Sequence, residues 1–97
     1  MEITKKVDGE KLTIAVSGRV DTVTAPELEG AFALAGVKEL TMDLSGVPYM
    51  SSAGLRCLLV AQKTMMAQGG SMTVVGTQPA VREVLDITGF SDILTLA

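Results

Sequence analysis

The segment Asp43-Leu-Ser-Gly-Val-Pro-Tyr-Met-Ser-Ser-Ala-Gly-Leu55 joins the two elements on which the fold depends. Before it, apolar side chains alternate over 37–44, which predicts a central strand with one buried face. Behind it, apolar residues recur at helical spacing, which predicts a long helix that ends at Gly69-Gly70. In α/β folds, ligands and partners bind where such a strand ends and its helix begins.

Upstream of this segment, the sequence predicts a hairpin and a helix. Asp8-Gly9 separates strand-like runs over 3–7 and 11–17, because this dipeptide supplies the positive φ angles of a tight turn. Thr24-Ala-Pro-Glu27 has the pattern of a capping box, in which the Thr24 hydroxyl accepts from the Glu27 amide. Helical spacing of apolar residues then continues to Ala35, and Gly36 is placed to end that helix.

Downstream, the pattern predicts a short strand over 72–75, a helix from Pro79 to Gly89 and a last edge strand over 93–96. Strands that are separated by helices favour parallel crossovers. The predicted fold class is therefore α/β, with one domain over residues 1–97. Its mixed sheet has four to five strands, an N-terminal antiparallel hairpin and otherwise parallel pairing, with three to four helices packed on it.

Composition excludes several classes of function. The chain has 97 residues, a net charge of −3, one cysteine and no histidine. Without histidine, His-based catalysis and almost every zinc site are excluded. The acidic balance and the scarcity of aromatic residues argue against nucleic-acid binding. The N-terminus lacks the apolar core of a signal peptide and no apolar run could span a membrane, so we expect a cytoplasmic protein without membrane insertion.

The serine pair at the helix entrance is the strongest candidate site. Unpaired amides and the helix dipole favour an anion there, so a phosphoryl group on Ser51 or Ser52 would be tolerated. Alternatively, one serine is only an N-cap. The two interpretations are compatible if Ser51 caps the helix and Ser52 projects outward. The entrance would then present a small, neutral surface.

Other candidates have less specific patterns. The long helix is apolar on more than one side, so it is either flanked by other helices or exposes a docking surface, and Met65-Met66 is interpreted as core filler. Cys57 is interpreted as an inert small hydrophobe. Asp21 and Asp43 could hold Mg²⁺ or transfer protons, but without a third ligand nearby, solvated or loop-capping roles are favoured. We therefore predict no metal, no cofactor and no enzymatic activity.

Six spaced motifs run through most of the chain: Ser17-Gly-Arg-Val-Asp21, Asp43-Leu-Ser45, Met50-Ser-Ser-Ala-Gly-Leu55, Gly69-Gly70, Pro79-Ala-Val81 and Ile87-Thr-Gly89-Phe90. Over about 11–96 this pattern resembles the STAS domain, and more narrowly the bacterial anti-sigma-factor antagonists. The resemblance implies binding to an anti-sigma factor that is also a serine kinase of the GHKL type, with release of a sigma factor. Phosphorylation of a serine would end that binding, and a phosphatase would restore it.

By position, the resemblance makes Ser52 the phosphoacceptor, with Ser51 as second choice. It also matches Asp21 to an acidic residue near that site. The acceptor is often preceded by Asp in the family, where this chain has Ser51, and the stretch after the first helix is short for the family, which implies a shorter helix. The expected partner-binding residues are Asp21, Thr22, Tyr49, Met50, Ser51, Ser52, Ala53, Gly54 and Arg56. STAS-like domains also serve as accessory or scaffold subunits of transport and sensory complexes, where the serine pair would only cap the helix.

Overall fold

The computed structural model describes residues 1–97 and contains nine elements. In chain order they are β1 (Glu2–Asp8), β2 (Lys11–Ser17), α1 (Ala25–Gly30), β3 (Glu39–Gly46), α2 (Ser52–Ala67), β4 (Ser71–Val75), α3 (Pro79–Ile87), α4 (Phe90–Ile93) and β5 (Thr95–Leu96).

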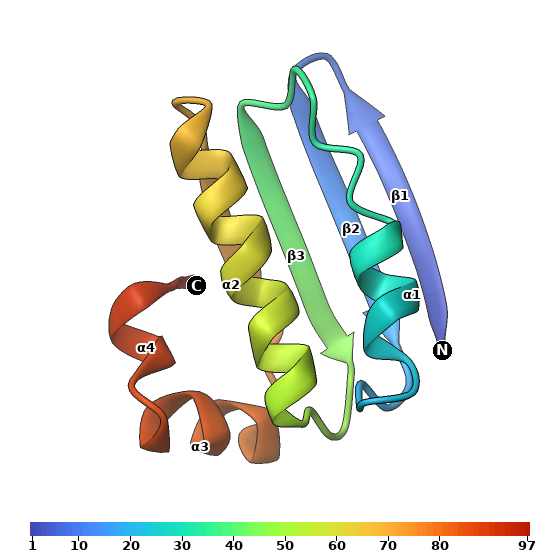
Figure 1. Cartoon of the computed structure of the whole chain (residues 1–97), viewed down its shortest axis with the longest axis vertical. Coiled ribbons are helices and arrows are strands. Elements are labelled where there is room, and N and C mark those ends of the chain that lie inside the picture. The colour runs from blue at the N-terminus through green and yellow to red at the C-terminus, as the bar shows by residue number, and fades with distance from the viewer.

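The strands form one five-stranded sheet in the order β1-β2-β3-β4-β5. Figure 1 shows β1, β2 and β3 side by side in this sheet. β1 and β2 pair antiparallel through a turn in which Gly9 has a φ of 62°. The pairs β2–β3, β3–β4 and β4–β5 are parallel, as the intervening helices require. The predicted mixed sheet with an N-terminal antiparallel hairpin is therefore confirmed.

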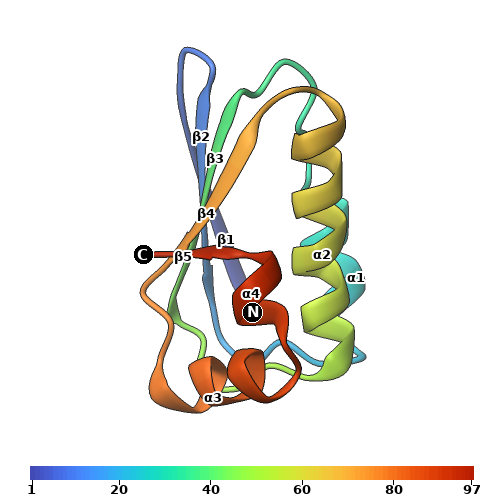
Figure 2. The same ribbon diagram turned by 90° about the vertical axis from the view of Figure 1, so that its left-hand side faces the viewer.

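Helices α1 and α2 lie on one face of this sheet (Figure 2). The alternation read from the sequence puts Ile14, Met42 and Val74 on that face, and all three are fully buried. Leu28 of α1 and Leu58 of α2 pack into the same core. The opposite face presents Thr13, Thr41 and Thr73, which lie in register on three neighbouring strands.

The first helix is shorter than the apolar spacing predicted. It ends at Gly30, and Ala35 and Gly36 lie outside it and are exposed. Leu34 is the buried residue of this stretch, because the chain turns there to reach β3. The Lys38 amide donates to the Glu10 carbonyl at 2.8 Å, which ties this connection to the hairpin turn. The shorter helix is the one that the family resemblance implied.

Two further predictions were wrong. Residue 93 belongs to α4, so the last strand contains only Thr95–Leu96. The α4 turn forms because Gly89 adopts a φ of 81° and the Leu94 amide donates to the Phe90 carbonyl. Met65 is buried as predicted, but Met66 is 65% exposed and is no core filler.

None of the helices has the length and apolar character that a membrane span needs.

Candidate functional site

Two loops run side by side at the carboxyl ends of β2 and β3. We call them the paired loops, residues 18–24 and 47–51. The Gly18 amide donates to the Gly46 carbonyl at 2.8 Å, and the Val20 amide donates to the Tyr49 carbonyl at 3.1 Å. The Ser51 amide in turn donates to the Val20 carbonyl at 2.9 Å. These backbone bonds place the segment after β2 directly beside the entrance of α2.

The first turn of α2 packs closely on the paired loops because residue 54 is glycine. A Cβ atom on Gly54 would lie 2.6 Å from Met50 Cγ and 2.8 Å from Val20 Cγ1, closer than real contacts allow. Gly54 and Met50 are both buried, Met50 with only 2% of its surface exposed. Both were expected to contact a partner directly. The structure instead places them beneath the surface, where they set its shape.

The two serines at the helix entrance differ in environment. Ser51 is the N-cap residue with extended backbone, and its carbonyl accepts from the Leu55 amide at 3.0 Å. Its hydroxyl makes no capping hydrogen bond, and Ser51 Oγ is buried without a partner. Ser51 is therefore the N-cap by position, as predicted, but its hydroxyl does not provide the cap. Ser52 is the first residue of α2, and its side chain is exposed.

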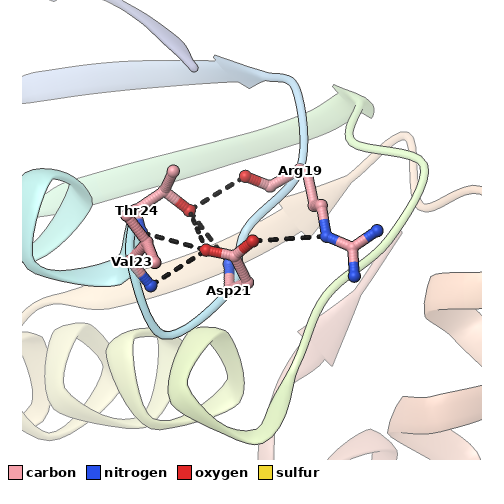
Figure 3. A network of polar contacts seen from close by, with 4 residues as sticks. All are labelled: Arg19, Asp21, Val23 and Thr24. Carbon is pink, nitrogen blue, oxygen red and sulfur yellow. Dashed lines mark hydrogen bonds and ion pairs between the residues drawn. The ribbon is translucent and has the colours of Figure 1, made fainter.

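Asp21 organises the loop after β2 through a hydrogen-bond network (Figure 3). Its carboxylate accepts from the amides of Val23 at 2.9 Å and Thr24 at 3.1 Å, and from Arg19 Nε at 3.2 Å. These bonds, led by the one from the Thr24 amide, hold the pKa of Asp21 below its usual value. Asp21 therefore has the loop-capping role that the sequence favoured.

The predicted capping box at the start of α1 does not form. The Thr24 hydroxyl points back into the Asp21 loop, where it accepts from the Asp21 amide at 2.9 Å and lies 2.9 Å from the Arg19 carbonyl oxygen. The Glu27 amide donates to the Thr24 carbonyl instead. The Asp21 amide donates to the hydroxyl in place of the Glu27 amide, and the Asp21 carboxylate accepts from the Thr24 amide that Glu27 was expected to reach.

A third connection supports the entrance of α2 from the side of β4. Gln78 Nε2 donates to the Ser45 carbonyl at 2.8 Å. Asp43 Oδ1 accepts from the Ser45 amide at 2.9 Å, which is again a loop-capping role. A Cβ atom on Gly76 would lie 2.9 Å from the Ser45 Cβ, so the β4–α3 connection approaches β3 closely. The loop that carries Tyr49 is thus held from both sides.

The exposed surface of the site is more charged than the sequence suggested. The Arg19 guanidinium lies 4.3 Å from the centroid of the Tyr49 ring, a cation–π contact between the two loops. Arg56 is exposed on α2, so the expected neutral surface carries two cations, of which only Arg19 has an acidic partner.

Sequence reasoning missed Arg19 and Val23. Val23 is 86% exposed at the tip of the Asp21 loop, an apolar side chain beside a candidate interface. Arg19 lies within the motif Ser17-Gly-Arg-Val-Asp21. Its contact with Tyr49 joins residues 30 positions apart, and no local pattern reveals such a contact. Thr22 is exposed and Ala53 is half-buried, so both lie where a partner can reach them.

Comparison with known proteins identifies relatives of the whole chain. The STAS domain family model matches residues 2–97. The anti-sigma-B factor antagonist of Listeria monocytogenes is 33% identical over 95% of this chain and 83% of that protein. The crystal structure of an anti-sigma factor antagonist from Mycobacterium paratuberculosis is 31% identical, with a TM-score of 0.85 over 98% of this chain and 83% of that one.

The fold is also that of the anti-sigma factor antagonist SpoIIAA. Its unphosphorylated form superposes with a TM-score of 0.84 at 19% identity, covering 99% of this chain and 88% of that one. The phosphorylated form of the Bacillus protein has a TM-score of 0.70 at 18% identity, over 99% and 91%. The chain therefore belongs to the STAS domain family, and its relatives there include anti-sigma-factor antagonists.

Proposed function

We propose that this protein is an anti-sigma-factor antagonist that binds an anti-sigma factor through the paired loops and the entrance of α2. Binding would free a sigma factor in the cytoplasm. Phosphorylation of Ser52 by the same anti-sigma factor, acting as a serine kinase of the GHKL type, would end the binding, and a phosphatase would restore it. One observation carries the proposal: Ser52 is exposed at the first turn of α2, on a surface that the backbone bonds between the paired loops hold in place.

The environments of the two serines favour Ser52 as the phosphoacceptor. Ser51 Oγ is buried, so it is closed to a nucleotide held in a kinase site. The exposed Ser52 hydroxyl would attack the γ-phosphorus of ATP, the bond to the β-phosphate oxygen would break, ADP would leave, and the hydroxyl proton would pass to a base of the kinase. The phosphatase would use water to cleave the phosphoester and release inorganic phosphate.

The helix entrance is suited to carry the phosphate. The first turn of α2 contains no acidic residue, so a dianion on Ser52 meets the positive end of the helix dipole without local repulsion. In the complex, the same dianion would be desolvated at the interface. An uncompensated buried charge costs several kcal/mol, roughly 3–5 when one partner of a pair is missing, which lowers affinity by orders of magnitude.

The experiment compares serine variants against a kinase-type anti-sigma factor from the same organism. Incubation with ATP followed by mass spectrometry is expected to find one phosphate on Ser52 in the wild type and in Ser51→Ala, and none in Ser52→Ala. Calorimetry is expected to show that Ser52→Ala binds like the wild type and that Ser52→Glu binds more weakly. If the kinase binds the wild type but phosphorylates neither serine, the switch is refuted while the binding role stands.

A further inference from the structure

The outer face of α2 has a charge unlike that of the rest of the protein. The helix contains Arg56, Lys63 and no acidic residue. It therefore contributes +2, and subtracting this from the net charge of −3 leaves −5 for the remaining residues. Neither cation has an acidic partner, since the three ion pairs of the protein involve other residues. Carboxylates one turn away would stabilise such cations on an exposed helix, and α2 provides none.

These cations lie on one stripe that begins at the proposed phosphorylation site. Residues three and four positions apart share a helix face, and Ser52, Arg56, Leu59, Lys63 and Met66 follow this spacing along α2. We call these five residues the cationic stripe. All of them are exposed except Leu59, which is half-buried, and Met66 is 65% exposed. No other element lies in front of α2 in Figure 1.

We propose that the cationic stripe continues the partner-binding surface along α2 and docks an acidic surface with an apolar patch on the same anti-sigma factor. This inference rests on the proposed function. Charge complementarity supports it, because the rest of the chain is acidic and would repel such a partner. Continuity also supports it, because the stripe begins at Ser52. Met66 and Leu59 would pack against the apolar patch of the anti-sigma factor, and the flexible methionine side chain adapts readily to a partner.

The stripe also connects the phosphate with the partner. Ser52 and Arg56 are four residues apart in α2, so a phosphate on Ser52 is within reach of the Arg56 guanidinium on the next turn. That pair would withdraw Arg56 from the partner's carboxylates. Phosphorylation would therefore reverse the charge at the start of the stripe, where acidic groups of the partner are expected.

The test compares two charge reversals that change the net charge equally. Lys63→Glu lies on the stripe, whereas Lys6→Glu lies on β1, on the face of the sheet without helices. Both side chains are exposed, so both variants are expected to fold, which circular dichroism checks. Binding of the anti-sigma factor is measured by calorimetry, and its association rate at two salt concentrations.

We expect Lys63→Glu to weaken binding about tenfold, mainly through a slower association that loses its salt dependence, and Lys6→Glu to change it less than about twofold. Met66→Ser is expected to weaken binding several-fold, and Met66→Leu to preserve it. Equal effects of the two charge reversals would overturn the inference, while loss of binding in Ser52→Glu would still support the proposed function. If the wild type binds no anti-sigma factor, both proposals are refuted.

Discussion

Gly54 is the residue at which the site tolerates the least added volume. In Gly54→Ala the new methyl would overlap Met50 Cγ and Val20 Cγ1, neither of which is the free end of an exposed side chain. Alanine favours a helix over glycine by about 1 kcal/mol, but overpacking costs roughly 1–3 kcal/mol. We therefore expect a net loss of about 1 kcal/mol in the free energy of unfolding, measured by urea denaturation.

Gly30→Ala is the matched control for that measurement. Gly30 is also in a helix, and a Cβ atom there meets nothing within 4 Å. The same change is therefore expected to be neutral or stabilising. If Gly54→Ala were equally harmless, the close approach of α2 to the paired loops would not be a constraint on the fold.

Because of Asp21, the free energy of unfolding depends on pH in the acidic range. Because the pKa of Asp21 is lower in the folded state than in the unfolded state, its contribution is present above the unfolded value of about 3.9 and is lost as the pH falls through the folded value. The pKa of Asp86 is lowered too, by hydrogen bonds from Ser91 and Arg82, and contributes with the same sign. Asp21→Asn is expected to lower stability at pH 7 and to flatten its decrease below pH 4.

Unfolding by urea at pH 7 and at pH 3 measures this effect. Asp8→Asn serves as the control, because the Asp8 side chain makes no hydrogen bond and is exposed. A variant Asp21→Asn with the same acid sensitivity as the wild type would mean that the network in Figure 3 does not stabilise the folded state.

At the scale of elements, α2 is expected to tolerate its own phosphorylation. A phosphate at its N-terminus interacts favourably with the helix dipole, worth about 0.3–1 kcal/mol, and the pair with Arg56 adds a smaller amount. We expect fully phosphorylated protein to unfold at the same or a higher temperature than unmodified protein, and Arg56→Ala to reduce that difference. Thermal unfolding followed by circular dichroism provides the measurement. A lower unfolding temperature would indicate that the phosphate acts by disrupting the helix.

The elements show where reading the sequence succeeds and where it fails. The central strands and the long helix were predictable because their apolar period repeats over many residues, although the strand expected over 37–44 is found over Glu39–Gly46. The end of α1 was not, because apolar spacing continued to Ala35 while the hydrogen bond from Lys38 to Glu10 turned the chain away. That bond joins distant positions, and local periodicity contains no information about it.

The candidate site was also predictable only in part. The serine pair was predictable because the helix entrance is a local feature of the sequence. The difference between a buried Ser51 oxygen and an exposed Ser52 depends on how α2 packs on a loop 30 residues upstream. The Arg19–Tyr49 contact depends on the same packing. Burial of Met50 also follows from it.

At the scale of the whole molecule, Cys57 reports on opening of the fold. Cys57 lies on the buried side of α2, and its thiol donates to the Ala25 carbonyl of α1 at 3.4 Å. Burial raises the pKa of this thiol, so little thiolate is present at neutral pH. We expect a thiol reagent to label native protein far more slowly than urea-unfolded protein. Rapid labelling in native buffer would show that α1 opens from α2 without global unfolding.

The backbone hydrogen bonds that hold the paired loops affect how fast the protein can respond to phosphorylation. Three backbone hydrogen bonds and the packing at Gly54 fix the surface in one arrangement. Under the proposed function, a phosphate changes the charge of that surface without any folding step. The protein would then add no delay of its own to the circuit in which it acts. The speed of response, and the persistence of each state, would be set by the turnover of the kinase and the phosphatase.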